Sequence, residues 1–388
     1  MTSIHKVAVV FGTRPEAIKM APVITALRSH PHLQPLVVVT AQHREMLDQH
    51  LRHFAIAPDY DLNIMTHRQG LTDATVRAIQ GLAQVFAQER PAVVLVQGDT
   101  TTTFAGALAA FHHQIPVGHI EAGLRTYDPY SPFPEEMHRR LTGVLAHLHF
   151  AATPAARDNL LREGVSPQRI FVTGNTTIDS LLQTVAGDYV FGDGELAVFL
   201  DQARRQGLRL VLVEVHRREN FGPAMVGIWQ AIARLVRTRP DIALVASIHR
   251  NPEVRGPAQA ALEGLPRVHK AEPLPYGDWA NLMARSYFMI TDSGGLQEEA
   301  PSLGVPVLVT REKTERPEAV AAGTVRLVGT DPETIYDEAV RLIEDPAAHR
   351  AMAQAANPFG DGRAAERTVA ALAYDLGLTE HRPEEFVP

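Results

Sequence analysis

Three carboxylates in the first half of the chain stand where expected strands give way to loops or helices. Asp99 follows one buried apolar segment, Glu121 ends the next, and Glu135 begins a helix after a proline-rich loop. Because the carboxyl ends of parallel strands meet at one edge of a sheet, we expect the three side chains to converge there. Converging carboxylates are the components of proton abstraction and donation. The simpler alternatives are a helix N-cap for Asp99 and a favourable interaction with a helix dipole for Glu135.

A turn in the second half has the composition of a phosphate site. Ser293, Gly294 and Gly295 lie between an expected strand and a helix predicted over residues 296–303. Glycines let the backbone approach a ligand closely, and a helix N-terminus favours an anion such as a diphosphate. Arg316 follows the next strand and is expected at the same sheet edge. A plain helix entry without a ligand is the alternative.

Further charged residues are expected at these edges. Glu298 and Glu299, one turn into the helix after the glycines, are predicted to face outward toward ribose hydroxyls. Arg14 and Lys19 stand near the start of the first helix, where cations oppose the helix dipole and so indicate an anionic ligand. His216 ends a strand of the second half. Solvated surface charge is the alternative for these cations.

Length and composition exclude several classes of protein. The chain has 388 residues, a formal net charge of −7, 45% hydrophobic residues and no cysteine. Its length suits two domains, and its acidic balance argues against a general nucleic-acid binder. The lack of cysteine excludes disulfides and thiolate chemistry. We find no segment long and apolar enough to span a membrane and no signal peptide, so we expect a cytoplasmic protein.

Strand-like and helical segments alternate through both halves, which predicts an α/β chain with parallel sheets. We predict an N-terminal domain over residues 1–174 and a C-terminal domain over 175–363. A last helix, over about 364–376, is expected to pack back onto the first domain. Strand alternation predicts that His119 and Glu121 share one face.

Eight segments, in this order along the chain, carry a resemblance to a known family. They are FGTRPEAIKMAP (11–22), TAQHREMLDQ (40–49), GDTTTT (98–103), HIEAGLRT (119–126), FPEEMHR (133–139), HRREN (216–220), TDSGGLQEEAPSLGVPVL (291–308) and ERPEAV (315–320). Together they resemble the bacterial UDP-N-acetylglucosamine 2-epimerases of the non-hydrolysing type. The resemblance covers residues 6–376, nearly the whole chain.

The resemblance implies a fold, an activity and a partner. The fold would be two Rossmann-like α/β domains of the glycosyltransferase B type, with the active site in the interdomain cleft. The activity would be reversible conversion of UDP-N-acetylglucosamine to UDP-N-acetylmannosamine, with neither a metal nor a nicotinamide cofactor. The product would supply envelope polysaccharides, and the protein would be a homodimer.

The resemblance also implies roles for individual residues. Elimination of UDP would give a 2-acetamidoglucal intermediate, to which UDP and a proton re-add with the other configuration. Asp99, Glu121 and Glu135 would be the acids and bases, with the face of C2 that each serves left open. The diphosphate would be held by His216, Arg14, Lys19 and the amides of Ser293, Gly294 and Gly295. Glu299 would bind the ribose, and Arg316 would add positive charge near the nucleotide.

A second molecule of UDP-N-acetylglucosamine is implied as an allosteric activator, with Gln42, His43 and Glu136 as its contacts. Two positions depart from the family pattern. Glu214 stands where threonine is usual, and Arg250 stands where an apolar residue or proline is more frequent. A carboxylate at 214 could repel a diphosphate, or it could raise the pKa of His216 and keep the ring cationic.

Two other activities are compatible with many of these residues. A hydrolysing relative would release UDP and free N-acetylmannosamine from the same intermediate, although the complete segments 40–49 and 133–139 favour the non-hydrolysing form. A glycosyltransferase of the same fold would need an acceptor site and a single base, so three acidic positions argue against it. A non-catalytic sugar-nucleotide sensor would not explain the acid–base set.

Overall fold

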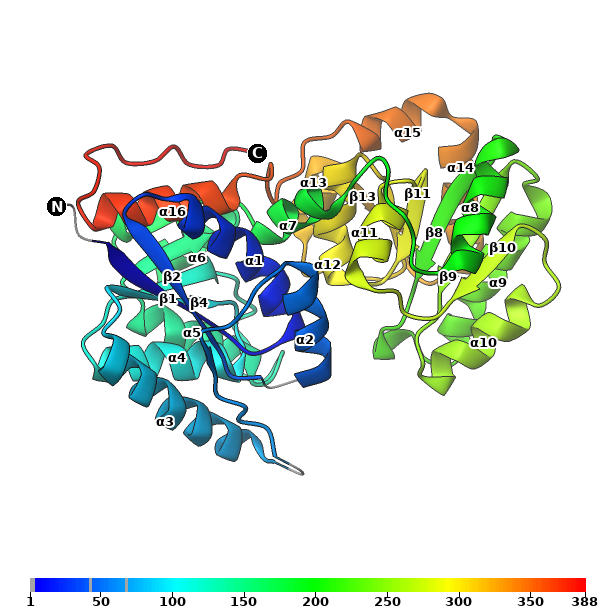
Figure 1. Cartoon of the computed structure of the whole chain (residues 1–388). Coiled ribbons are helices and arrows are strands. Elements are labelled where there is room, and N and C mark those ends of the chain that lie inside the picture. Colours follow the sequence, from blue (N-terminus) through cyan, green and yellow to red (C-terminus); the bar gives the residue numbers. More distant parts are fainter. Residues whose placement is uncertain (1–3, 42–43, 67–68) are drawn as a thin grey trace. The chain divides into compact units, whose positions relative to one another are not determined.

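The computed structural model describes residues 4–41, 44–66 and 69–388. These residues form two compact units, which Figure 1 shows in sequence colours. The first unit takes in residues 1–180 together with 359–388, and the second takes in 181–358. The end of the chain therefore belongs to the same unit as its beginning.

The first unit contains a parallel sheet of seven strands in the order β3-β2-β1-β4-β5-β6-β7. Its strands are β1 (His5–Phe11), β2 (Leu33–Val39), β3 (Tyr60–Asp61), β4 (Val93–Gln97), β5 (Val117–Ala122), β6 (Leu148–Ala151) and β7 (Ile170–Val172). Both faces of the sheet are covered. In β1, Val7, Val9 and Phe11 enter one hydrophobic core, whereas Ala8 and Val10 enter the other. This explains why the strands are apolar throughout.

Helices cover both faces of this sheet. They are α1 (Arg14–Ser29), α2 (Arg44–His53), α3 (Leu71–Glu89), α4 (Thr101–His112), α5 (Glu135–Leu145), α6 (Pro154–Arg162), the 3₁₀ turn η1 (Pro167–Arg169) and α16 (Ala364–Asp375). The helix α7 (Thr176–Thr184) begins in the first unit and ends in the second. Residues of α1 and α16 share one core, and residues of α3 and α4 share the other. Figure 1 shows α16 alongside α1.

The C-terminal segment is fixed to the first unit by specific contacts. At the start of α16, the amides of Ala364 and Ala365 donate to Asp179, at 3.2 and 2.8 Å. Beyond that helix, the amide of Phe386 donates to the carbonyl of Val172 in the edge strand β7 at 2.7 Å. Phe386 itself is buried. The C-terminal segment is therefore hydrogen-bonded to the first unit and contributes to its core.

The second unit contains a parallel sheet of six strands in the order β10-β9-β8-β11-β12-β13. Its strands are β8 (Arg209–Glu214), β9 (Ile242–Ser247), β10 (Val268–Ala271), β11 (Phe288–Thr291), β12 (Val307–Val309) and β13 (Val325–Leu327). The order from the edge through β11 repeats that of the first sheet from β3 through β4. The predicted fold class of two Rossmann-like domains of the glycosyltransferase B type is confirmed.

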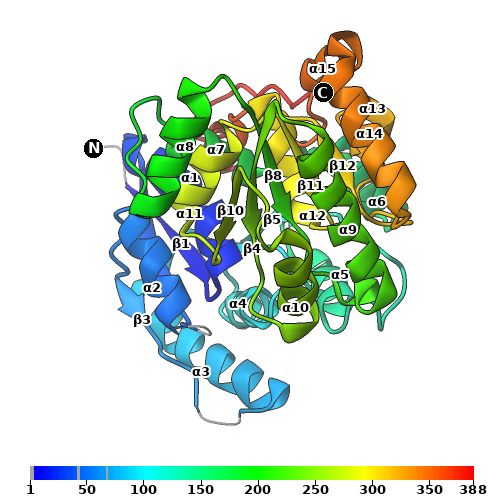
Figure 2. The same cartoon turned by 90° about the vertical axis from the view of Figure 1, so that its right-hand side faces the viewer.

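Helices cover this sheet as well. They are α8 (Gly194–Arg205), η2 (Arg218–Asn220), α9 (Pro223–Thr238), α10 (Pro252–Leu262), α11 (Tyr276–Met283), α12 (Gly294–Glu299), η3 (Ala300–Leu303), α13 (Pro317–Ala322), α14 (Pro332–Glu344) and α15 (Pro346–Ala353). Figure 2 shows α9 and α10 on one side of the strands and α8 and α11 on the other. Residues of α9, α10 and α14 share a core with β8 around the fully buried Trp229.

One predicted helix differs in its bounds and type. The segment 296–303 was expected to be a single helix, but α12 begins at Gly294 and ends at Glu299, and the 3₁₀ turn η3 follows. Pro301 has no amide hydrogen to donate within an α-helix, so the chain tightens there. Gly304 then ends the turn in the left-handed conformation, with φ of 68°.

Each sheet reverses its strand order at one place, between β1 and β4 in the first unit and between β8 and β11 in the second. Ligands of open α/β sheets bind beyond the carboxyl ends of the strands at such a reversal. The loops that follow these four strands carry residues 12–13, 98–100, 215–217 and 292–293. These loops are the places in the fold where a site is expected.

We predict that Leu372→Ala in α16 destabilises the first unit by about 2–5 kcal/mol, because its side chain is fully buried in the core shared with α1. Urea unfolding followed by circular dichroism measures the change. Leu141→Ala in α5, where the leucine is 41% exposed, is the matched control and should cost less than about 1 kcal/mol. Equal effects of the two substitutions would contradict the placement of α16.

Candidate active site

Asp99 is free of helix capping and available for another role. Thr100 caps α4 instead, since its hydroxyl accepts from the amide of Thr103 at 3.2 Å. The carboxylate of Asp99 forms an ion pair with Arg139 of α5. The N-cap interpretation of Asp99 is therefore wrong. Arg139 lies one helical turn beyond Glu135, and this spacing of four residues places both side chains on one face of α5.

Two histidines fix the turn that carries Asp99. Nε2 of His119 lies 2.7 Å from the carbonyl of Gly98, and Nδ1 of His138 lies 3.0 Å from the carbonyl of Asp99. Carbonyls only accept, so each of these ring nitrogens carries a proton. Complete burial lowers the pKa of His119 to about 3, and burial also lowers the pKa of His138. Neutral histidines therefore hold the backbone on both sides of the Asp99 carboxylate.

Glu121 occupies an unusual backbone position at the end of β5. The register between β5 and β6 shifts between Ile120 and Ala122, and Glu121 has φ of 62°, a conformation that is rare for a residue with a side chain. Regular alternation, on which the prediction of a face shared with His119 rested, is thus interrupted. The Glu121 carboxylate accepts hydrogen bonds from Nζ of Lys19 and Nε2 of Gln97. Strain of this kind is typical of functional sites.

Glu121 and Glu135 both lie within electrostatic reach of Asp99. Burial is the main cause that raises the pKa of Asp99. The positive charge of Arg139 opposes this rise, the negative charges of Glu121 and Glu135 add to it, and Lys19 opposes it. A carboxyl group with a raised pKa beside other carboxylates is the arrangement that separates acid from base.

Glu16 joins the two loops at the strand-order reversal of the first unit. It is 1% exposed, and its carboxylate accepts from the amides of Gly12 and Thr13 at 3.0 and 2.8 Å. It also accepts from the hydroxyl of Thr100 at 2.7 Å. Sequence reasoning missed Glu16. Its signal was a glutamate three residues after a threonine at a helix start, the spacing of a capping box.

Two buried threonine side chains leave no room for a side chain at Gly12. A Cβ added to Gly12 would lie 2.1 Å from Oγ1 of Thr40 and 2.5 Å from Oγ1 of Thr102. These two hydroxyls are hydrogen-bonded to each other at 2.8 Å. Arg14 lies two residues after Gly12 and is exposed. No ion-pair partner for Arg14 is found in the part of the chain that the structure describes.

Glu136 has a structural position next to Glu135. It is fully buried, and its carboxylate accepts from the amides of Thr126 and Tyr127 at 3.0 and 3.1 Å. It therefore holds the loop after β5 on the start of α5. The other two predicted activator contacts, Gln42 and His43, lie outside the described residues.

Asp292 organises the loop after β8 in the second unit. It is fully buried after β11, and its carboxylate accepts from the amides of His216 and Arg217, each at 2.9 Å. Nδ2 of Asn220 donates to it as well, at 2.9 Å. Burial raises the pKa of Asp292, and these donors oppose the rise. Sequence reasoning missed Asp292, although it ends a strand at the expected ligand edge.

His216 contacts a carboxylate through one ring nitrogen. Its Nδ1 lies 2.8 Å from Oε1 of Glu214 and 3.7 Å from Oδ1 of Asp292. The hydrogen bond with Glu214 is the main cause that raises the pKa of His216, and desolvation opposes it. Arg250, the other departure from the family pattern, is exposed, and its Nε lies 3.5 Å from Oε2 of Glu272.

The glycine turn is open on one side. A Cβ added to Gly295 would meet nothing within 4 Å, and Gly295 is exposed. A Cβ added to Gly294 would lie 3.4 Å from Nη2 of Arg217. The amide of Ser293 donates to the hydroxyl of Thr291 at 3.0 Å. Arg217 therefore stands beside this turn, a position that its distance in sequence conceals.

Two arginines that follow β12, Arg311 and Arg316, are paired with carboxylates. Arg316 forms an ion pair with Glu298, and Arg311 lies 2.6 Å from Glu219 and 2.9 Å from Glu315. Glu298 is 4% exposed, so the prediction that it faces outward is wrong, since the helix turns this carboxylate toward Arg316. Its neighbour Glu299 is partly exposed.

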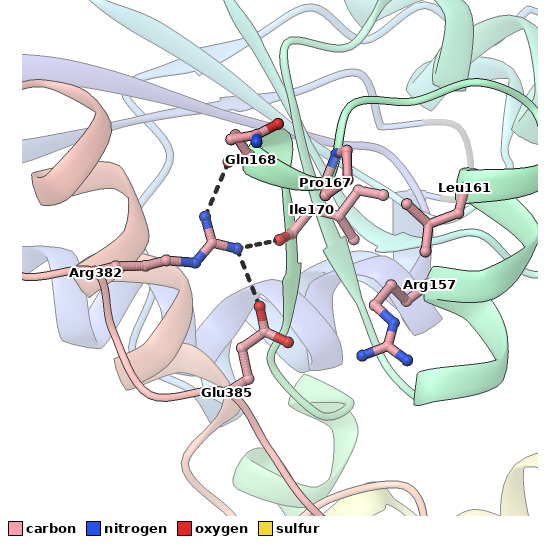
Figure 3. Close-up of a pocket in the computed structure, with 7 residues that line it drawn as sticks. All are labelled: Arg157, Leu161, Pro167, Gln168, Ile170, Arg382 and Glu385. Atoms are coloured by element: carbon pink, nitrogen blue, oxygen red, sulfur yellow. Dashed lines mark hydrogen bonds and ion pairs between the residues drawn. The ribbon is translucent and has the colours of Figure 1, made fainter.

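A surface pocket of the first unit lies away from all of these residues. It is lined by Arg157, Leu161, Pro167, Gln168, Ile170, Arg382 and Glu385. Figure 3 shows Arg382 bound to the carbonyls of Gln168 and Ile170 and to Glu385. The guanidinium is thus occupied by the protein itself. The pocket contains none of the predicted site residues.

The described residues contain neither a candidate metal site nor a helix suited to crossing a membrane. No group of three or more histidine, aspartate and glutamate side chains is placed to hold a metal ion within residues 4–41, 44–66 and 69–388. None of the helices formed by these residues has the length and apolar character needed to cross a membrane.

A model of the family described as UDP-N-acetylglucosamine 2-epimerase matches residues 25–373 of the chain. This chain belongs to that family. The family is named for an isomerase activity, the epimerisation of UDP-N-acetylglucosamine. The match includes the carboxylates of the first unit and the histidine and glycine turn of the second.

Individual members of the UDP-N-acetylglucosamine 2-epimerase family match over almost their full length. The chain is 52% identical to the UDP-N-acetylglucosamine 2-epimerase of Bacillus subtilis over 381 residues, which is 98% of each protein. It is 53% identical to that of Escherichia coli over 374 residues, which is 95% of this chain and 98% of the relative. A crystal structure of UDP-GlcNAc 2-epimerase from Neisseria meningitidis bound to UDP-GlcNAc has a TM-score of 0.81 and 48% identity, covering 95% of this chain and 99% of that one.

We predict that Asp292→Asn destabilises the second unit by about 2–3 kcal/mol, because one amide oxygen replaces two carboxylate oxygens that accept from three groups. Hydrogen exchange should become faster at the amides of His216 and Arg217. Asp193→Asn is the control, since asparagine caps α8 as well as aspartate does. Unchanged exchange at both amides would contradict the anchoring role of Asp292.

Proposed function

We propose that this protein interconverts UDP-N-acetylglucosamine and UDP-N-acetylmannosamine reversibly, without net hydrolysis. The observation that carries the proposal is the group of Asp99, Glu121 and Glu135, in which the partly buried carboxyl of Asp99 has a raised pKa. Family membership supports the UDP-sugar as substrate, because relatives bear the name of this activity. A relative's structure is described as bound to UDP-GlcNAc.

The reaction begins by breaking two bonds of the sugar. The C2–H group has no neighbouring carbonyl, so its proton is too weakly acidic for simple abstraction. Loss of the proton is therefore coupled to departure of UDP from C1, and the C2–H electron pair forms the C1–C2 double bond of 2-acetamidoglucal. The C1–O electron pair leaves with UDP. Return of UDP and delivery of a proton to the other face of C2 give the epimer.

The carboxylates of the first unit supply the proton transfers. A base on one face of C2 and an acid on the other are needed, which requires at least two carboxyl groups with different protonation. Asp99, whose pKa is raised by burial, is suited to hold a proton. Glu121 has a cationic partner in Lys19 and is suited to accept one. Glu135 is the third candidate, and we leave the face that each serves open.

The second unit supplies stabilisation of the departing diphosphate. We assign this role to His216 and to the amides of Ser293, Gly294 and Gly295, with Arg316 adding positive charge. Glu299 would accept hydrogen bonds from the ribose. In the first unit, Arg14 and Lys19 would contact the diphosphate, and Arg14 has an exposed guanidinium for it.

We propose a cytoplasmic homodimer whose product supplies envelope polysaccharides. UDP-N-acetylglucosamine would also act as an activator through Gln42, His43 and Glu136. Glu136 already binds two amides of the loop after β5, so an activator that contacted it would act on the same loop.

Incubation with UDP-N-acetylglucosamine in D₂O, followed by proton NMR, tests the proposed reaction. We expect deuterium at C2 in a stable mixture of two UDP-sugars, because every turnover returns a solvent-derived proton to C2. Accumulation of UDP and free N-acetylmannosamine would instead identify a hydrolysing enzyme. Retention of the C2 proton at saturating substrate would refute the epimerase.

We predict that Asp99→Asn slows C2 exchange about 100-fold or more, since general acid–base groups contribute roughly 10²–10⁴-fold. The variant should fold, because the neutral amide replaces a carboxyl whose ionised form is disfavoured by burial. Asp158→Asn, at an exposed carboxylate of α6, is the matched control and should exchange at the wild-type rate. Wild-type exchange by Asp99→Asn would remove Asp99 from the mechanism.

A further inference from the structure

The last residue of β8 is a carboxylate that the proton transfers at C2 do not use. Glu214 is the register partner of Thr291 in β11, at the strand-order reversal of the second sheet. Its Oε1 lies 2.8 Å from Nδ1 of His216, and its Oε2 accepts from Oγ1 of Thr291 at 3.4 Å. Both carboxylate oxygens therefore have partners within the sheet edge.

The nearby Asp292 does not replace Glu214 as the partner of the ring. Asp292 is 3.7 Å from Nδ1 of His216, and its oxygens already accept from two backbone amides and from Asn220. Glu214 is thus the carboxylate that contacts the ring at hydrogen-bond distance. Nδ1 faces this carboxylate at the separation of an ion pair, which leaves Nε2 as the other functional atom of the ring. No protein partner of Nε2 is found among the described residues.

Four charged or titratable side chains face the His216 ring. Glu214 and Asp292 are negative and favour a cationic ring, whereas Arg217 is positive and opposes it. His249 stacks on the ring with centroids 5.6 Å apart and planes inclined by 22°. Nδ1 of His249 accepts from the amide of Asn251 at 3.1 Å, which places the His249 proton on Nε2. Two carboxylates therefore outweigh one guanidinium around His216.

We propose that Glu214 is a positioning residue that holds His216 through Nδ1 as an imidazolium, with Nε2–H available to the diphosphate that leaves C1. This inference rests on the proposed function for its ligand. The ring donates a hydrogen bond from Nε2 as the C1–O electron pair passes to UDP, and no bond to the ring forms or breaks. A charged donor stabilises developing negative charge more strongly than a neutral one. Glu214 supplies this charge state through the ring and does not touch the substrate.

The first test measures His216 directly and needs no activity. We would titrate the imidazole of His216 by NMR in the wild-type protein and in Glu214→Gln, assigning its signal with His216→Asn. Glutamine keeps an acceptor at the same place but removes the charge. We expect the pKa of His216 to fall in Glu214→Gln, because the hydrogen bond to Glu214 is the main cause that raises it. An unchanged pKa would overturn the proposal.

The second test measures the pH dependence of C2 exchange. A raised pKa keeps His216 protonated as the pH rises, and activity that needs the imidazolium is lost only as the pH passes through that pKa. In Glu214→Gln this alkaline loss should therefore begin at lower pH. At a pH above the pKa of His216 in both proteins, kcat of Glu214→Gln should be lower than that of the wild type by about tenfold for each unit by which the pKa has fallen. Glu214→Asp retains a carboxylate and should restore part of the wild-type profile.

The same sign applies to stability. The raised pKa of His216 stabilises the folded state at low pH, and this contribution is lost as the pH rises through the folded-state pKa. The difference in unfolding free energy between wild type and Glu214→Gln should therefore be present in acid and vanish in alkali. Asp375→Asn removes another carboxylate, which lies 3.0 Å from Nε2 of His147 in the first unit, and should leave the exchange profile unchanged.

The outcomes separate this inference from the proposed function. If the pKa of His216 is lower in Glu214→Gln but the wild-type protein shows no C2 exchange, the effect of Glu214 on His216 is supported and the epimerase activity is refuted. If the wild-type protein exchanges C2 normally and the alkaline loss of exchange begins at the same pH in Glu214→Gln, the epimerase activity stands and the role of Glu214 is overturned. If Glu214→Gln binds UDP more tightly and its alkaline loss of exchange begins at the wild-type pH, Glu214 only repels the diphosphate. This result would also overturn the positioning role of Glu214.

Discussion

Buried carboxylates that accept hydrogen bonds from backbone amides hold the loops at both strand-order reversals. In the first unit Glu16 accepts hydrogen bonds from two amides of the β1–α1 turn and from the hydroxyl of Thr100 in the loop after β4. In the second unit Asp292 accepts from two amides of the β8–α9 loop. Burial of a charged carboxylate is costly unless several donors compensate for it, so each carboxylate constrains its donors closely. The positions of Asp99 and His216 depend on these two anchors.

The two units share a topology but supply different chemistry. The first unit concentrates carboxylates and compensates for them with Lys19 and Arg139. The second unit presents His216 and a glycine turn beside Arg217. In the proposed reaction, the first set moves protons at C2 and the second stabilises charge on UDP. This division explains why one repeated fold carries two dissimilar residue sets.

The sequence predicted the sheets and most loop positions because apolar strands and polar strand ends recur at regular intervals. It predicted that Asp99, Glu121 and Glu135 converge, since the carboxyl ends of parallel strands meet at one edge. It missed the partners that lie far apart along the chain, such as Arg139 for Asp99 and Arg217 for Gly294. It also predicted that Glu298 faces outward, because helical periodicity alone does not show that Arg316, further along the chain, pairs with this carboxylate. The backbone of Glu121 departs from strand alternation through a register shift that no local pattern announces.

In the proposed reaction, departure of UDP and loss of the C2 proton belong to one reversible sequence of steps. Positional isotope exchange tests it most directly, with ¹⁸O placed in the bridge between C1 and the β-phosphate of UDP-N-acetylglucosamine. We expect the label to move into the non-bridging positions of the β-phosphate in UDP-sugar recovered at equilibrium, because the C1–O bond breaks and re-forms. Epimerised product that retained all of its label in the bridge would contradict it.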